Sequence, residues 1–123
     1  MSLILIVEDS VGIAECLKDA LEMAGHTVYV AGTMRGAMDS LERLPVEAVI
    51  SDGLIPSYEI SHPPVAWGPE ITAFCRKTGI RAVLYSADDE LVEAERRAGG
   101  VALLKPAGLN QILDALERDP VRR

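Results

Sequence analysis

The sequence is poor in aromatic residues and has no long apolar run, and each shortage excludes a class of structure. Aromatic residues make up 4% of the 123 residues, so a core must consist mainly of Ala, Val, Leu and Ile. No apolar run is long enough to span a bilayer, and no signal peptide precedes the first apolar segment, which begins almost at Met1. We therefore expect a cytoplasmic protein with no membrane partner.

Cysteine and basic residues are also scarce. The two cysteines, Cys16 and Cys75, fall within predicted helices and lack the spacing of metal ligands. They are interpreted as buried free thiols of a reducing compartment. The formal net charge is -7 and no basic face is visible, so direct binding to nucleic acid is not expected.

The segments that are present alternate between two patterns. Hydrophobic residues make up 49% of the chain and charges of both signs occur, which is typical of one globular domain with a sizeable core. Short apolar runs rich in β-branched residues predict buried strands. These runs are residues 3–7, 26–31, 48–50, 81–85 and 101–104.

Apolar residues at helical spacing follow each predicted strand. In the third helix, Ile71, Phe74 and Cys75 are predicted to face the core. Local start and stop signals bound the helices. The signals are Ser10 and Gly25, Thr33 and Pro45, Gly68 and Gly79, residues 87–89 and Gly99, and Asp119 at the end of the last helix. Strict alternation of strands and helices predicts right-handed βαβ units around a parallel sheet.

Polar side chains follow four of the predicted strands at the point where each strand ends. Glu8 and Asp9 follow the first, Asp52 the third, Ser86 the fourth and Lys105 the last. Because ligands of an open parallel sheet bind at the carboxyl ends of its strands, these side chains are expected to share one edge. A capping acid or a solvated lysine is common at any single position, but the ordered set is far more specific.

This ordered set resembles the receiver domain of two-component response regulators, and Pro106 after Lys105 matches the same pattern. The resemblance implies a doubly wound, flavodoxin-like sheet of five parallel strands over residues 1–118, followed by a polar tail at 119–123. It implies that Asp52 accepts a phosphoryl group from a sensor histidine kinase or a histidine phosphotransfer protein. A downstream protein or an output domain would then read the changed conformation.

The resemblance also assigns a role to each polar residue. Clustered carboxylates repel one another, and Mg²⁺, which prefers oxygen ligands, removes that repulsion. Asp9 and Asp52 would bind Mg²⁺ directly, Glu8 through water, and Leu54 through its backbone carbonyl. Asp52 would be the nucleophile, with Ser86 and Lys105 stabilising the transferring group.

Three features depart from the family pattern. Ala102 stands where an aromatic residue is usual, three positions before the lysine, and Tyr85 either shares that role or, as we favour, simply packs under a helix. Ser86 replaces the commoner threonine. Residues 57–67 form an insertion with the only Trp, either a partner-binding or covering loop or a surface insertion with Trp67 packed down. By the same resemblance, Leu54 and Asp88 occupy the positions that influence how fast the phosphorylated aspartate is hydrolysed in this family.

Other functions fit less well. A phosphorylation-independent interaction module would keep the acidic cluster while its switch is degenerate at Ala102. A phosphohydrolase with Asp52 as nucleophile commonly has a second acid two residues on, where this chain has Leu54. A nucleotide or flavin binder fits the topology, but no glycine-rich loop follows the first strand.

Overall fold

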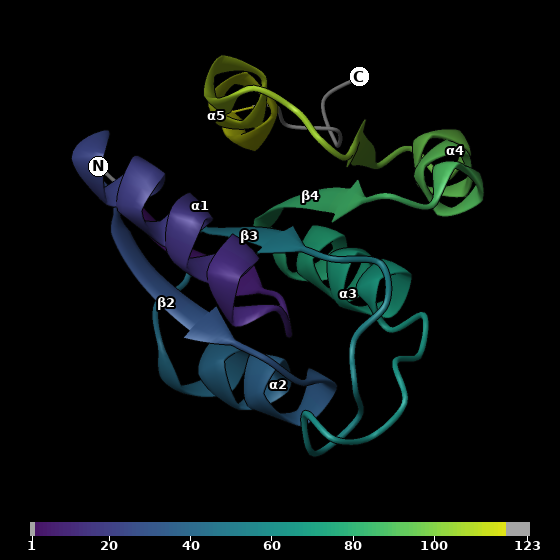
Figure 1. Ribbon diagram of the computed structural model, residues 1–123. Coiled ribbons are helices and arrows are strands. Elements are labelled where there is room, and N and C mark those ends of the chain that lie inside the picture. Colours follow the sequence, from purple (N-terminus) through teal and green to yellow (C-terminus); the bar gives the residue numbers. More distant parts are fainter. Residues whose placement is uncertain (1, 118–123) are drawn as a thin grey trace.

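The computed structural model describes residues 2–117, which form a parallel sheet covered by helices on both faces (Figure 1). All neighbouring strands are parallel, and their order is β2-β1-β3-β4-β5. The strands are β1 (Leu3–Val7), β2 (Thr27–Ala31), β3 (Ala48–Ser51), β4 (Arg81–Ser86) and β5 (Val101–Leu104). The five-stranded, doubly wound sheet predicted from the sequence is therefore confirmed.

Helices connect the strands and divide between the two faces of the sheet. They are α1 (Val11–Met23), α2 (Met34–Arg43), α3 (Gly68–Thr78), α4 (Asp89–Arg97) and α5 (Leu109–Glu117). Helices α1 and α5 pack on one face, and α2, α3 and α4 pack on the other. Among residues 2–117, no helix is both long and apolar enough to cross a membrane. The predicted tail at 119–123 and the helix end at Asp119 lie outside the described residues.

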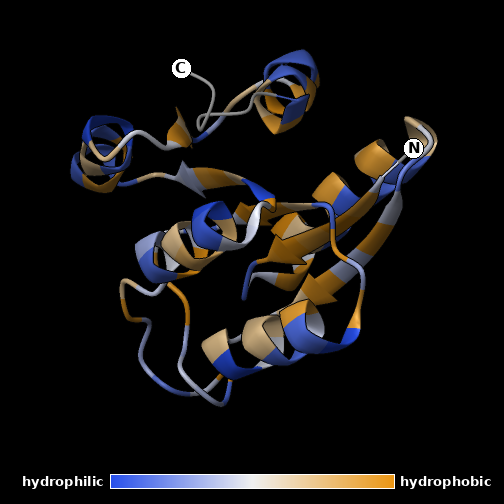
Figure 2. Cartoon of the chain, turned by 180° about the vertical axis from the view of Figure 1, so that it is seen from behind, coloured by the Kyte–Doolittle hydropathy of each residue, from blue (hydrophilic) through white to orange (hydrophobic). Residues whose placement is uncertain are grey.

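The central strands are buried on both faces, which explains why they are apolar without alternation. In β1, Ile4 and Ile6 join the core under α1 and α5, whereas Leu5 and Val7 join the core under α2 and α3. Figure 2 shows hydrophobic strands in the middle of the molecule and helices that carry both hydrophilic and hydrophobic residues. Burying each such side chain contributes about 1.5–3 kcal/mol to the stability of the fold. The packed strands therefore fix the positions of the residues that follow them at the edge of the sheet.

Capping contacts confirm two of the predicted helix starts. The Thr33 hydroxyl accepts from the Gly36 N–H at the start of α2, and the Asp88 carboxylate accepts from Glu90 and Leu91 at the start of α4. Ser10 differs, because its side chain makes no cap hydrogen bond. Its backbone N–H donates instead to the Glu8 carboxylate, at 3.2 Å.

Two predicted core residues lie outside the core. Cys16 is exposed, because α1 turns Ala14, Leu17 and Leu21 toward the sheet and leaves Cys16 beside that stripe. Phe74 is 39% exposed for the same reason. In α3 the buried positions include Thr72, whose hydroxyl donates to the Pro69 carbonyl.

A buried ion pair that the sequence did not indicate joins α3 to α4. The Glu95 side chain is 3% exposed, and its Oε2 lies 2.6 Å from Nη1 of Arg76. The pair packs against Gly100, where a Cβ would lie 2.5 Å from the Glu95 oxygen. Removing one partner of such a pair leaves an uncompensated buried charge, so the pair fixes α4 relative to α3.

The two thiols should differ sharply in reactivity. Burial raises the pKa of Cys75 to about 12, with a small opposing effect from Arg76. Because the thiolate is the reactive form, we expect one fast-reacting thiol in the folded protein at pH 8 and two after unfolding in guanidinium, measured with Ellman's reagent. Cys16→Ser should remove the fast reaction and Cys75→Ser should leave it. Fast labelling of folded Cys16→Ser would contradict the placement of Cys75.

Candidate functional site

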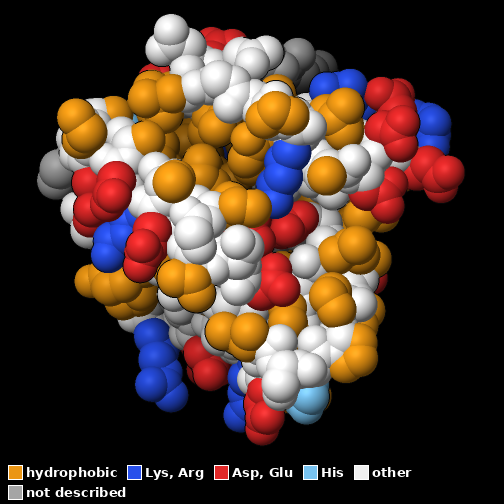
Figure 3. Space-filling model, viewed as in Figure 1, with side chains coloured by type: hydrophobic (Ala, Val, Ile, Leu, Met, Phe, Trp, Pro, Cys, Tyr) orange, Lys and Arg blue, Asp and Glu red, His pale blue; other side chains and the backbone are white. Residues whose placement is uncertain are grey.

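The carboxyl ends of β1, β3, β4 and β5 bring the predicted site residues together. Val7 pairs with Ser51, so the residues that follow, Glu8 and Asp52, are neighbours. Ser86 pairs with Leu104, which places Lys105 one residue beyond the same edge. Figure 3 shows acidic and basic side chains together on this face, with hydrophobic side chains around them.

Three carboxylates form the acidic part of the site. Glu8, Asp9 and Asp52 each offer an oxygen, and these oxygens lie within 4.8 Å of one another. Glu8 is 4% exposed, whereas Asp9 and Asp52 are half-buried. Burial raises the pKa of Glu8, and the neighbouring charge of Asp52 raises it further, while the Lys105 contact opposes both effects. Hard divalent cations prefer such a cluster of carboxylate oxygens.

Lys105 lies between two of these carboxylates. Its Nζ is 2.8 Å from Oε1 of Glu8 and 3.2 Å from Oδ2 of Asp52. Burial alone would lower the pKa of Lys105, but hydrogen bonds and charge attraction from Glu8 and Asp52 outweigh burial and raise that pKa. The ammonium group is therefore charged at neutral pH. The Lys105–Pro106 peptide bond is cis.

The Asp52 carboxylate is held by a donor on each oxygen. Oδ1 accepts from the Gly53 N–H at 2.6 Å, and Oδ2 accepts from Lys105. A Cβ at Gly53 would lie 2.7 Å from Cδ1 of Leu91 and 2.8 Å from Oγ of Ser86, so a larger residue there would require these side chains to move. The Asp52 carboxylate is thus positioned by the backbone of the next residue, Gly53, and by Lys105, which follows the last strand.

Ser86 and Leu54 flank Asp52 in different ways. Ser86 is 2% exposed, and its Oγ accepts from the Asp88 N–H at 3.1 Å, which leaves its hydroxyl hydrogen to donate. The Leu54 side chain is 42% exposed beside the site. A metal-binding role for the Leu54 carbonyl stays a prediction.

Tyr85 and Ala102 lie on opposite faces of the sheet. Ala102 packs with Leu84 and Val92 under α4, and its carbonyl accepts from the Arg96 guanidinium. Tyr85 packs in the core under α1 and α5, its hydroxyl accepts from the Ala107 N–H, and its ring centre lies 5.4 Å from Nζ of Lys105. Tyr85 therefore cannot fill the position that Ala102 leaves, and the packing interpretation is supported.

Tyr85 also lines a groove between α1 and α5. This groove has a volume of about 570 Å³ and is lined mainly by apolar side chains, Ile13, Leu17 and Leu109 among them. It is visible in Figure 3 as a hollow lined by hydrophobic side chains.

The insertion after Asp52 is a closed loop whose two ends meet. Ile55 and Val65 form an antiparallel bridge with both backbone hydrogen bonds at 2.9 Å. Just beyond it, the Gly68 N–H donates to the Gly53 carbonyl at 3.1 Å. The half-buried Trp67 packs against the core under α2 and α3, and its Nε1 donates to the Ser57 hydroxyl at 2.9 Å.

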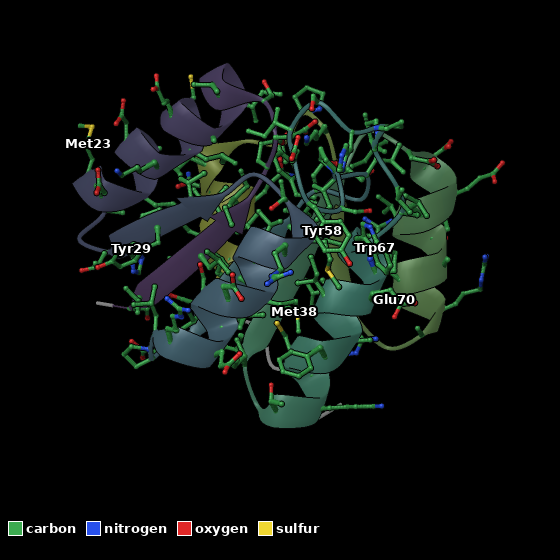
Figure 4. The ribbon with its side chains drawn as sticks, turned by 90° about the horizontal axis from the view of Figure 1, so that it is seen from below. Met23, Tyr29, Met38, Tyr58, Trp67 and Glu70 are labelled. Carbon is green, nitrogen blue, oxygen red and sulfur yellow. The ribbon has the colours of Figure 1, made fainter. Side chains whose placement is uncertain are left out.

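The loop is also attached to α2. The Pro56 and Ser57 carbonyls accept from the Met34 and Arg35 N–H groups, which satisfies the free donors at the start of that helix. Figure 4 shows Tyr58 and Trp67 where the loop passes α2 and α3. Trp67 is thus packed down as one interpretation expected, yet Tyr58 remains 65% exposed.

Comparisons with known proteins agree with this geometry. No protein-family model matches the chain. The chain is 30% identical over 115 residues to the response regulator protein FleR of Pseudomonas aeruginosa. The aligned region covers 94% of this chain and 24% of that protein. The chain therefore spans about a quarter of the length of this relative.

Several solved structures share the fold. The receiver domain of HemR from Leptospira biflexa has a TM-score of 0.71 at 23% identity, covering 98% of this chain and 94% of that one. The chemotaxis response regulator CheY4 of Vibrio cholerae has a TM-score of 0.75 at 22% identity, covering 97% and 98%. TrrA of Thermotoga maritima, solved with Mg²⁺ and BeF, has a TM-score of 0.75 at 20% identity, covering 93% and 95%.

The fold is the one shared by the solved receiver domains, and in this chain the acidic cluster and the lysine lie together at one edge of the sheet. The chain is similar to part of the response regulator FleR over nearly all of its length, and it shares the fold of the HemR receiver domain and of CheY4.

Gly68 should be required for the position of Asp52. A Cβ at residue 68 would collide with the Asp52 carbonyl oxygen and lie 2.7 Å from Cα of Gly53. We expect Gly68→Ala to lower the free energy of unfolding by about 1–3 kcal/mol in urea titrations, since the backbone must move to make room. The control is Gly12→Ala in α1, where no atom lies within 4 Å of the new Cβ and a small gain in stability is expected. Equal stability of Gly68→Ala and the unmodified chain would contradict the close approach.

Proposed function

We propose that this chain is a phosphoacceptor that takes a phosphoryl group from a phosphohistidine onto Asp52. The observation that carries the proposal is the Lys105 ammonium between Glu8 and Asp52, with Asp9 beside them. An ionised carboxylate needs no general base, and both Asp52 oxygens already have donors that orient the group.

In the proposed reaction, a carboxylate oxygen of Asp52 attacks phosphorus in line with the phosphorus–nitrogen bond of the phosphohistidine. The new bond joins phosphorus to the Asp52 oxygen, and the old bond leaves its electron pair on the imidazole nitrogen. Lys105 and the Ser86 hydroxyl are proposed to stabilise the negative charge on the transferring oxygens. The product is an aspartyl phosphate, which water later removes.

The acidic cluster has the chemistry of a magnesium site. Three carboxylates within reach of one another are the hard oxygen ligands that Mg²⁺ binds. Asp9 and Asp52 are proposed as direct ligands, Glu8 as a ligand through water, and Leu54 as a ligand through its carbonyl. Bound Mg²⁺ would supply positive charge next to the transferring oxygens. The Mg²⁺–BeF complex of TrrA supports this assignment, since that protein shares the fold.

The partners follow from the reaction. The donor is proposed to be a sensor histidine kinase or a histidine phosphotransfer protein in the cytoplasm. Phosphorylation of the receiver domain, residues 1–118, would shift its conformational equilibrium, and a downstream protein or an output domain would read α4, β5 and α5. The chain would catalyse its own phosphorylation and dephosphorylation and turn over no separate substrate.

One observation favours a second candidate function. Ala102 lacks the side chain that usually responds to the hydroxyl residue, and Arg96 holds its carbonyl with bonds of 3.0 and 3.3 Å. A chain whose α4 does not respond to phosphorylation would act as a phosphorylation-independent interaction module. Binding of Mg²⁺ without phosphorylation would support that function.

Intact mass after incubation with acetyl phosphate separates the two functions. We expect a gain of one phosphoryl group that requires Mg²⁺ and is absent in Asp52→Asn, because the amide is not a nucleophile here. The control is Asp39→Asn, which changes an exposed carboxylate on α2 and should label normally. A folded, Mg²⁺-binding chain that gains no mass would contradict phosphoacceptance, as would normal labelling of Asp52→Asn.

A further inference from the structure

The loop after Asp52 carries a group of exposed hydrophobic side chains. Leu54, Tyr58, Ile60 and Val65 are 42%, 65%, 59% and 44% exposed, and we call these four residues the loop patch. All four lie within a segment that begins two residues after the phosphoacceptor. Binding residues are concentrated on loops, and exposed hydrophobic side chains beside a reactive group are candidates for contact with a partner.

The loop patch is held in a fixed shape. The Ile55–Val65 bridge closes the loop, Trp67 is bonded to Ser57, and two carbonyls of the loop accept from the first N–H groups of α2. Ordering this insertion costs conformational entropy. Because this loop is already ordered with its hydrophobic side chains exposed, binding a partner would cost less conformational entropy, which favours binding.

The loop extends from Asp52 to the segment beside Glu8. At its base, Gly68 packs directly against the backbone of Asp52 and Gly53. Farther along, Cδ1 of Ile60 lies 3.1 Å from the Cβ position of Gly32, and the Glu8 carbonyl oxygen lies 3.8 Å from that same position. The loop therefore borders the backbone of Asp52 and of Glu8, two residues of the acidic cluster. In Figure 3 hydrophobic side chains lie next to the acidic centre of the face.

We propose that the loop patch is a docking surface for the protein that carries the phosphohistidine, and that it sets which donor proteins this chain accepts. The inference rests on the proposed function. The donor's phosphorus must come into contact with an oxygen of Asp52, so any donor protein covers the surface around Asp52. A protein that only reads the conformation of α4 and α5 has no such requirement.

The patch also defines the chemistry of the donor. Short-lived protein complexes bury about 1,200 Å² or less in total, and a few anchor side chains at the centre supply most of the affinity. Tyr58 and Ile60 have the size and exposure of such anchors. The fitting donor therefore presents apolar side chains next to its phosphohistidine. A small phosphodonor such as acetyl phosphate needs none of these contacts.

The test compares two double variants with two phosphodonors. Tyr58→Ala/Ile60→Ala removes the two most exposed members of the loop patch. The matched control is Met23→Ala/Tyr29→Ala, which removes side chains that are 90% and 46% exposed at the end of α1 and on β2. Figure 4 shows Met23 and Tyr29 at the left edge of the view, away from Tyr58 and Trp67 near its centre.

The donors are acetyl phosphate and a radiolabelled histidine kinase from the source organism, chosen as the one that transfers fastest to the unmodified chain. We expect Tyr58→Ala/Ile60→Ala to lower kcat/KM for transfer from the kinase by about tenfold or more. Its labelling by acetyl phosphate should change less than twofold, and the control should change less than twofold with both donors.

Other outcomes overturn the inference. Unchanged kinase transfer would exclude docking on the loop patch. Equal loss with both donors would show that the loop only positions Asp52. If acetyl phosphate labels the unmodified chain but no histidine kinase does, the proposal that a phosphohistidine protein docks on the loop patch is excluded. A dimer that dissociates in Tyr58→Ala/Ile60→Ala during sedimentation would assign the patch to a second copy of the chain. If neither donor labels the unmodified chain, the proposed function fails first.

Discussion

The Lys105 ammonium between Glu8 and Asp52 is the interaction on which the site depends. Two carboxylates that share a small, partly buried volume repel each other, and repulsion is stronger there than in bulk water. Lys105 offsets that repulsion by donating to one oxygen of Asp52, while the Gly53 N–H donates to the other. Because 97 residues separate Lys105 from Glu8, the contact exists only when the first and last strands have joined the same sheet.

The rest of the fold serves this arrangement. The buried strands fix the register that makes Glu8 and Asp52 neighbours, and the pairing of Ser86 with Leu104 delivers Lys105 to the same edge. At Gly68 the chain packs directly against the backbone of Asp52 and Gly53, and at Gly53 it packs against the side chains of Leu91 and Ser86. The site is thus built from rigid strand ends, and the loop that follows Asp52 adds a surface without changing the chemistry.

The sequence predicted what local rules determine. Apolar runs predicted the strands and therefore which residues follow them. Thr33, Asp88 and Gly79 predicted helix ends, because the contacts that form these ends lie within a few residues. The sequence analysis missed features that distant contacts decide, and it misplaced two residues on their helices. Glu95 lies on a strongly polar helix, and its burial depends on Arg76 in α3. Cys16 and Phe74 sit beside, and not on, the buried stripe of their helices. The path of residues 57–67 depends on bonds to α2 that no local pattern encodes.

The central claim is that the phosphoryl group resides on Asp52 as an acyl phosphate. Borohydride reduces an aspartyl phosphate to homoserine, so reduction of the labelled chain followed by peptide mass mapping identifies the residue directly. The account predicts homoserine at position 52 and nowhere else, only when phosphodonor and Mg²⁺ are both present. Homoserine at another position, or a phosphoryl group that survives reduction on a hydroxyl residue, would contradict it.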